Sequence, residues 1–225
     1  MESQNVSIED FVQSQIDRWQ MIKQTQQVEV PVITVSMEPG SKGRLIAEKI
    51  AELAEFDFFH RDIIKEIAES VKMSEKVIDS LEKDRLSGIV DLVDSIVNKY
   101  YIHQNTYLVH LMKVINTIAR HGRAVIVGRG ANFILSPADR FSVRVVAPLD
   151  LRVKNVAEAY GTSVDEAKKR VIVRQSRRTA FVRQAYNEDI NDPLNYDMVV
   201  NTGNLSIECA AAAIIAAVRE CRSTV

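Results

Sequence analysis

The chain has 225 residues, of which 46% are hydrophobic and 26% are charged, and its formal net charge is -1 at pH 7. This length and composition allow one sizeable core, or one core that carries a smaller lobe. The near balance of charge excludes a surface that is basic throughout, as in a general nucleic-acid or membrane binder, but it leaves room for a local basic patch. The sequence shows neither a signal-peptide pattern nor a run of roughly 20 apolar residues, so we expect a cytoplasmic protein with no membrane partner.

The first element that we expect is an amphipathic helix within an N-terminal segment, residues 1–29. Apolar residues recur at helical spacing from Ser7 to Ile22, and Ser7 with Asp10 forms a start that resembles a capping box. This helix, or the helical lobe described next, is where we expect the contacts of a homo-oligomer if one forms.

Five β-rich runs follow, separated by helical segments: "EVPVITVS", "FDFF", "AVIVG", "FSVRVVA" and "MVVN". This alternation predicts an α/β domain over residues 30–225, a five-stranded parallel sheet with helices on both faces. Residues of about 72–120 contain a single glycine and no strand pattern, which predicts a helical insertion. Ligand sites are expected beyond the carboxyl ends of the strands.

The stretch "MEPGSKG" lies between the first strand and a helix. Gly40 and Gly43 permit unusual backbone angles and close approach, and the N–H groups of such a loop and helix start bind anions. The standard phosphate-loop pattern is absent, because Gly43 occupies its lysine position and Arg44 and Leu45 stand where a Mg²⁺-binding hydroxyl is expected. The pattern alone therefore leaves a phosphate-binding loop and a plain turn as alternatives. The helix that follows has apolar residues on a shared face: Leu45, Ile46, Ile50 and Leu53.

Several ordered motifs, "ITVSMEPGSKGRLIAEKIAE", "DFFHRDII", "AVIVGRGANFIL", "VRVVAPLDLRV" and "NDPLNYDMVVNT", resemble the cytidylate kinase-like family. This family is a nucleoside monophosphate kinase branch of the P-loop fold, and the resemblance covers roughly Pro31 to Arg219. It implies ATP-dependent phosphoryl transfer to a nucleoside monophosphate, CMP or similar, or to another small acceptor, with ATP and Mg²⁺ as cofactors. It also places the nucleotide phosphates on five residues of the loop: Gly40, Ser41, Lys42, Gly43 and Arg44.

The loop departs from the family pattern S-R-E-x-G-S-G-G at two positions. Met37 replaces the arginine, and Lys42 replaces the second of the three glycines. Lys42 lies one position before the usual lysine, so it could supply the catalytic charge that faces the phosphates, or it could point into solvent.

An acid-free run, "KKRVIVRQSRRTAFVR" from Lys168 to Arg183, concentrates seven cations. In the kinases that it resembles, this segment is the lid that closes over ATP, and the lid arginines stabilise the transferring phosphoryl group. The resemblance places the lid of this chain at residues of about 163–187. Arg174, Arg177 and Arg178 are the catalytic candidates. The alternatives are a solvated helix face and a nucleic-acid patch. Gln175 stands where related lids usually carry aspartate.

The acceptor site is expected at two further motifs. Arg129 of "VGRGAN" follows a strand and matches the arginine of the family's "GRD", whereas Gly130 replaces its acid. His60, Arg61 and Asp62 of "FFHRDII" match the acceptor entrance, with His60 at an aspartate position. Arg129 could instead pair with a structural carboxylate, and the "HRD" stretch could be a surface turn. Because two acids are missing, we expect poor selectivity for CMP.

The remaining features add few candidates. The segment "NTGNLS" offers Asn201, Thr202 and Gly203 to the adenine base, as the resemblance implies, and Cys209 and Cys221 are expected to be buried thiols. The histidines show no metal-ligand spacing, so we expect no protein-held metal. The functional alternatives to a kinase are a catalytically weak nucleotide-binding regulatory module and a basic nucleic-acid binder. The second has only one short basic tract to support it, so we expect no nucleic-acid partner.

Overall fold

The computed structural model describes residues 7–23, 32–81, 86–95 apart from 87, 90 and 92, and 106–221. The chain divides into two compact units, residues 1–30 with 61–122 and residues 31–60 with 123–225. Parts of the predicted N-terminal segment and much of the helical insertion expected over 72–120 lie outside the described residues. Within the described part, no helix is both long enough and apolar enough to span a bilayer.

The first unit is helical and contains the N-terminal helix α1, which begins as the sequence predicted. The Ser7 hydroxyl accepts a hydrogen bond from the N–H of Asp10 at 3.1 Å, which satisfies one of the unpaired donors of the first turn. The Trp19 ring is 4% exposed and stacks on His121, with ring centroids 3.9 Å apart. α1 therefore packs its apolar face within this unit. Its helices include α1 (Ile8–Lys23), α3 (Arg61–Glu69), α4 (Val71–Ile78) and α6 (Thr106–His121).

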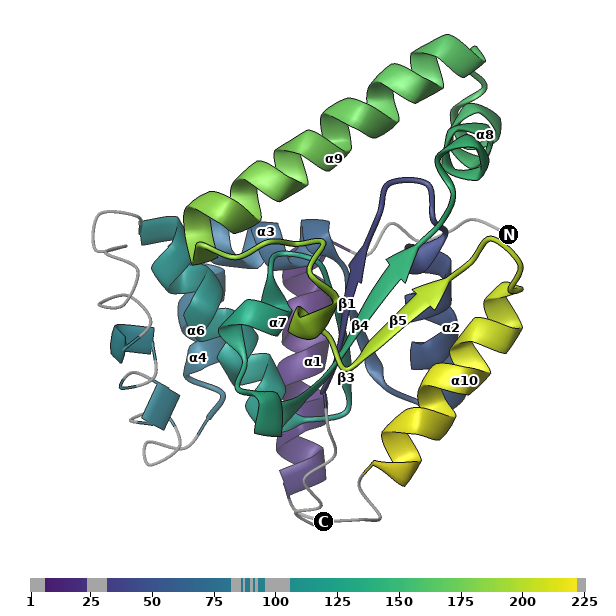
Figure 1. The fold of residues 1–225 in the computed structure, drawn as a ribbon. Coiled ribbons are helices and arrows are strands. Elements are labelled where there is room, and N and C mark those ends of the chain that lie inside the picture. The colour runs from purple at the N-terminus through teal and green to yellow at the C-terminus, as the bar shows by residue number, and fades with distance from the viewer. Residues whose placement is uncertain are drawn as a thin grey trace. The chain divides into compact units, whose positions relative to one another are not determined.

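The second unit holds the parallel sheet, whose strand order is β2-β3-β1-β4-β5 (Figure 1). All four strand pairs are parallel, and β1 and β4 share the longest register, from Val32 opposite Arg140 to Met37 opposite Val145. The predicted five-stranded parallel α/β fold is confirmed. The strands are β1 (Val32–Met37), β2 (Asp57–Phe59), β3 (Ala124–Val127), β4 (Arg140–Val146) and β5 (Met198–Asn201).

Two helices, α2 (Gly43–Ala54) and α10 (Ile207–Glu220), pack on one face of the sheet against an apolar cluster that includes Ile33, Val35, Val143 and Val145. The short helix α7 (Ala131–Ile134) follows β3 and lies close to β1. Single 3₁₀ turns occur at Pro137–Asp139 and Pro193–Asn195.

The buried stripe of α2 differs from the expected one. Ile46 and Ile50 are fully buried, but Leu45 is 46% and Leu53 is 48% exposed. The stripe instead runs through Gly43, Ala47 and Ala51, whose small side chains let the helix lie close to the sheet and α10.

The prediction that both cysteines are buried is wrong, since Cys209 and Cys221 are exposed. The face of α10 that packs inward is formed by Ala210, Ala211, Ile214 and Val218. Cys209 precedes this face, and Cys221 follows the last residue of the helix.

A helical hairpin, α8 (Leu149–Tyr160) and α9 (Val164–Tyr186), follows β4 and extends beyond the carboxyl end of the sheet (Figure 1). Its own small core consists of Val153, Val156, Ala167 and Val171. Ser163 caps α9 by accepting a hydrogen bond from the N–H of Glu166, and Gly161 with φ 60° ends α8. The segment predicted as a lid is thus one continuous helix of 23 residues.

Candidate phosphate-binding site

The loop between β1 and α2 has an unusual backbone. Gly40 has φ 85° and Lys42 has φ 59°, so both residues lie in the left-handed region, which costs a non-glycine residue roughly 1 kcal/mol. A side chain at Gly40 would collide with the carbonyl oxygen of Arg152 in α8. Glycine is therefore required at position 40 for both its backbone angle and its close contact.

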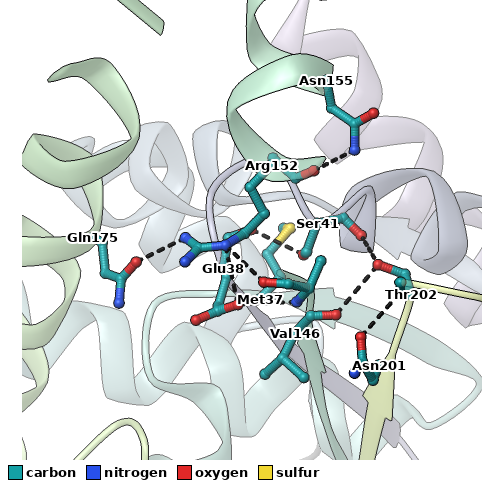
Figure 2. Close-up of polar contacts among 12 residues, drawn as sticks. Met37, Glu38, Ser41, Val146, Arg152, Asn155, Gln175, Asn201 and Thr202 are labelled. Carbon is teal, nitrogen blue, oxygen red and sulfur yellow. Dashed lines mark hydrogen bonds and ion pairs between the residues drawn. The ribbon is translucent and has the colours of Figure 1, made fainter. Parts of the chain in front are cut away.

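The carbonyl groups of this loop are held by hydrogen bonds, and three of the four donors lie far away in the sequence (Figure 2). Asn155 of α8 and Thr202, which follows β5, approach the tip of the loop, and Arg178 of α9 contacts its base. Because these carbonyl oxygens accept hydrogen bonds from the protein, they do not take up the space in front of the loop where a ligand would bind. The bonds are Arg178 Nη1 to Met37 O at 2.6 Å, Ser41 Oγ to Glu38 O at 2.9 Å, Asn155 Nδ2 to Gly40 O at 2.8 Å and Thr202 Oγ1 to Ser41 O at 2.9 Å.

Most N–H groups of the loop, in contrast to its carbonyl groups, lack a hydrogen-bond partner among the described residues. Within the described structure, no hydrogen-bond acceptor is found for the N–H groups of Gly40, Lys42, Gly43, Arg44 and Leu45. The last three open α2, where N–H groups lack intrahelical partners and the helix dipole favours an anion. Donors that are unpaired in the protein and gather at a helix N-terminus form an anion-binding site.

The structure explains why the standard lysine is missing. Gly43 is buried, and a Cβ atom at this position would lie 2.6 Å from the Cβ of Met37 and 3.1 Å from the Cβ of Val145. A lysine at position 43 would therefore require the loop to move away from the sheet. Lys42 precedes this crowded position and is exposed, and its assignment to a bound phosphate stays a prediction.

A buried ion pair that the sequence analysis missed holds the loop to α8. The Glu38 carboxylate accepts a hydrogen bond from the N–H of Ala147 at 3.0 Å and lies 3.3 Å from Nε of Arg152. The Arg152 side chain is buried at 8% exposure, and the Glu38 side chain is largely covered at 14%. Arg152 also donates to Gln175 of α9 at 2.8 Å (Figure 2), so Gln175 serves as a neutral acceptor where related lids carry an acid. The sequence feature that could have revealed this ion pair is the position of Glu38, a carboxylate directly after a buried strand.

The three lid arginines do not meet at one point. Arg178 contacts the loop through the carbonyl of Met37. Arg174 lies one helical turn earlier, where its guanidinium carbon is 5.1 Å from the ring centroid of Tyr160 and its Nη1 donates to the Tyr160 hydroxyl at 3.1 Å. Arg177 is exposed. Only Arg178 is in contact with the phosphate loop in this structure, and the catalytic assignment of all three stays a prediction.

Arg129 follows β3 in a strained turn. It has φ 55° between Gly128 at 79° and Gly130 at 69°, and its carbonyl oxygen accepts a hydrogen bond from the Tyr186 hydroxyl at 2.9 Å. A side chain at Gly130 would collide with the ring of Tyr186. An acid at this position, as in the family's "GRD", is therefore incompatible with the packing of Tyr186.

The remaining acceptor candidates are divided between the two units. His60 follows β2 in the second unit, where its ring centroid is 6.0 Å from that of Phe58. Arg61 and Asp62 open α3 in the first unit and form an ion pair at 3.0 Å. Their assignment to an acceptor site stays a prediction.

A parallel sheet whose first strand leads through this loop into a helix, with an arginine-bearing hairpin beside it, defines a protein of the P-loop kinase-like fold. The chain belongs to the cytidylate kinase-like family, whose sequence profile matches residues 32–204.

Curated relatives and a solved structure agree with this family and fold. The cytidylate kinase of Pyrococcus horikoshii is 28% identical over 188 residues, which cover 83% of this chain and 88% of the relative. The cytidylate kinase of Staphylothermus marinus is 26% identical over 178 residues, 79% of this chain and 90% of the relative. The crystal structure of an uncharacterized protein from Eubacterium ventriosum superposes with a TM-score of 0.69 at 22% identity, covering 84% of this chain and 98% of that one.

Proposed function

We propose that this protein transfers a phosphoryl group from ATP to a nucleoside monophosphate or to another small phosphorylated acceptor. The proposal rests on a difference between the carbonyl groups and the N–H groups of the loop. Its carbonyls are engaged by Arg178, Asn155 and Thr202. In the described part of the chain, no acceptor is found for the N–H groups of Gly40, Lys42, Gly43, Arg44 and Leu45. This arrangement suits the phosphates of a nucleotide.

In the proposed reaction the loop residues Gly40, Ser41, Lys42, Gly43 and Arg44 hold the donor phosphates. Lys42 supplies the charge that the usual lysine provides elsewhere. Arg178, already at the loop, together with Arg174 and Arg177, stabilises the charge of the transferring group after the lid closes over it. No covalent enzyme intermediate is needed, because positioning and electrostatic stabilisation account for in-line transfer.

Mg²⁺ fits this proposal as an ion that arrives with the nucleotide. The described residues contain no group of three or more His, Cys, Asp or Glu side chains that could hold a metal. The side-chain oxygens within the loop belong to Glu38 and Ser41, so we expect the phosphates and water to supply most ligands, as Mg²⁺ prefers in such sites. The ion would neutralise phosphate charge during transfer.

For the acceptor, the curated relatives are cytidylate kinases, which favours a nucleoside monophosphate. Arg129 and His60 of the second unit would contact it, and Arg61 and Asp62 stay candidates from the sequence resemblance. The collision between Tyr186 and any side chain at Gly130 removes the acid that the resemblance assigns to base recognition. We therefore propose that CMP is at most weakly preferred over other acceptors.

The second candidate function is a nucleotide-binding regulatory module with weak catalysis. The buried Gly43 favours it, because the standard catalytic lysine does not fit there. Magnesium separates the two functions: phosphoryl transfer requires the divalent ion, whereas a binding module can bind nucleotide equally well without it.

The deciding experiment measures ATP binding by calorimetry and ADP formation with and without Mg²⁺ for the wild type, Gly40→Val and Gly161→Val. Gly161 also has a positive φ, but a Cβ atom there meets nothing within 4 Å, so it controls for backbone strain. We expect Gly40→Val to lose ATP binding while it stays folded, and Gly161→Val to keep it. Equal ATP affinity in folded Gly40→Val would contradict the loop assignment.

A further inference from the structure

A polar group lies on the face of the sheet opposite the apolar cluster, at the carboxyl ends of β1 and β4. The residues of β4 alternate, so Val143 and Val145 enter the apolar cluster and Arg144 points to the other face. Arg144 lies opposite Ser36 in the β1–β4 register and is only 4% exposed.

The Arg144 guanidinium has only neutral partners. It donates from Nη1 to Ser36 Oγ at 2.8 Å and from Nη2 to Asn191 Oδ1 at 3.2 Å, and it lies 5.9 Å from the ring centroid of Tyr196. Within the described structure, no carboxylate lies within 4.0 Å of it. The other buried arginines differ, since Arg140 pairs with Asp197 at 3.3 Å and Arg152 pairs with Glu38 at 3.3 Å.

A buried guanidinium without a counter-charge is unfavourable for folding. Burial lowers the pKa of Arg144, an effect that the Glu38 and Asp189 carboxylates, which form no ion pair with it, partly oppose. Burial also raises the pKa of Tyr196, so its phenol is neutral at physiological pH and does not neutralise the arginine. The protein thus keeps a destabilising charge next to the phosphate loop, which is typical of a site that binds an anion.

The neighbours of Arg144 leave hydrogen-bond donors available. A guanidinium has five N–H donors, and two of these have acceptors here. Ser36 Oγ accepts from Arg144 at 2.8 Å. The Tyr196 hydroxyl donates its single proton to the carbonyl of Ile190 at 2.8 Å, so at 3.4 Å the Ser36 hydroxyl can only donate weakly to the Tyr196 oxygen, and an anion can take up this proton instead. Asn191 is exposed and Ser36 is half-buried, so an anion that displaces the Asn191 side chain would reach both donors.

We infer that Arg144 and Ser36 form an oxyanion site for the phosphate-monoester group of the acceptor. The inference rests on the proposed phosphoryl transfer and deepens it by naming the residues that hold the acceptor phosphate. Ser36 lies two residues before Glu38, at the strand ends where ligands of parallel sheets bind. The side chains of Arg144 and Ser36 lie on the opposite face of the sheet from α2, whose N-terminus holds the donor phosphates, so the two phosphate groups would occupy separate sites. The planar fork of arginine matches a phosphate dianion.

The test uses Arg144→Gln and Ser36→Ala, with Arg140→Gln as the matched control. Arg140 lies on the same face of the same strand and its side chain is 10% exposed, but it already has a carboxylate partner. Binding of inorganic phosphate and of AMP, CMP and UMP is measured by calorimetry in the presence of saturating nonhydrolysable ATP analogue, together with the melting temperature of each variant.

We expect Arg144→Gln to weaken phosphate and monophosphate binding by roughly tenfold or more, because a charged hydrogen-bonded contact is lost. Its melting temperature without phosphate should equal or exceed that of the wild type, since an uncompensated charge is removed. Arg140→Gln should melt lower and bind phosphate normally. Ser36→Ala keeps the guanidinium and should weaken phosphate binding several-fold. This variant provides the test if Arg144→Gln does not fold.

Unchanged phosphate affinity in Arg144→Gln, or in Ser36→Ala where that variant is used, would overturn the inference. So would competition between phosphate and the ATP analogue, because the loop would then be the only phosphate site. Wild-type protein that binds ATP but neither phosphate nor monophosphates would overturn the inference and leave the nucleotide-binding loop intact. Protein that binds phosphate through Arg144 but no ATP would instead refute the proposed kinase function.

Discussion

Asn155 donates a hydrogen bond to the carbonyl of Gly40 at 2.8 Å and so ties the first helix of the lid hairpin to the tip of the phosphate loop. The same loop residue packs against the backbone of Arg152, one turn earlier on α8. The loop conformation therefore depends on α8 as well as on its own glycines. The structure links the conformation of this loop to the position of the α8–α9 hairpin.

Removing this hydrogen bond should weaken nucleotide binding. We expect Asn155→Ala to lower ATP affinity by about 2- to 10-fold, because a single neutral hydrogen bond contributes about 0.5–1.5 kcal/mol. Asn195→Ala is the matched control, since its side chain donates to the carbonyl of Asp189 outside the loop. Calorimetric ATP titrations compare the two, and equal affinities would show that Gly40 and its neighbours hold the loop without α8.

Lys42 should matter for turnover through its charge. We expect Lys42→Met to lower kcat by roughly 10²-fold or more, because the variant loses a cation aimed at the transferring phosphates. Lys49→Met, in the helix that follows Lys42 and paired with Glu52, controls for loss of a lysine elsewhere. Steady-state assays of ADP release measure the effect. Wild-type turnover in Lys42→Met would show that Lys42 points into solvent and that another cation acts.

The lid arginines should act on the rate more than on binding. We expect Arg178→Ala and Arg174→Ala to lower kcat far more than ATP affinity, since interactions made in the transition state behave in that way. Arg174 must leave Tyr160 to contribute, so its effect reports lid movement as well as charge.

Arg170→Ala serves as the control for the lid variants, because Arg170 is already paired with Glu166 at 2.7 Å. Single-turnover rates and nucleotide titrations separate the two effects. If rate and affinity fall together in Arg178→Ala, the guanidinium belongs to a static binding patch that includes the carbonyl of Met37.

The acceptor range follows from Tyr186 and Gly130. We expect CMP to be preferred over UMP or AMP by less than about tenfold, because strong base discrimination needs polar groups that a wrong base leaves unpaired. The ratio of kcat/KM values in an acceptor screen with ATP and Mg²⁺ measures this. Exclusive phosphorylation of CMP would show that other groups recognise the base, while it would support the kinase class.

Sequence patterns alone determined the architecture. The five β-rich runs and the helix that follows Ser7 are present in the structure, because strand and helix periodicities and capping residues act over a few neighbouring positions. The ordered motifs also identified the family correctly. The hydrophobic periodicity predicted the wrong buried face for α2. Small residues form the contact of this helix with the sheet, so the buried stripe includes Gly43 and Ala47 rather than Leu45.

The tertiary structure alone decided how the site is built. The Asn155–Gly40 bond joins residues 115 positions apart, and the Arg144–Ser36 bond joins residues 108 positions apart. No pattern of neighbouring residues encodes such pairs, because they arise when parallel strands bring their carboxyl ends to one edge of the sheet. The exclusion of a side chain at Gly130 by Tyr186, and the buried charge of Arg144, follow from that packing in the same way. The sequence placed the chemistry near the strand ends, and the fold determined which groups are paired and which remain available to a ligand.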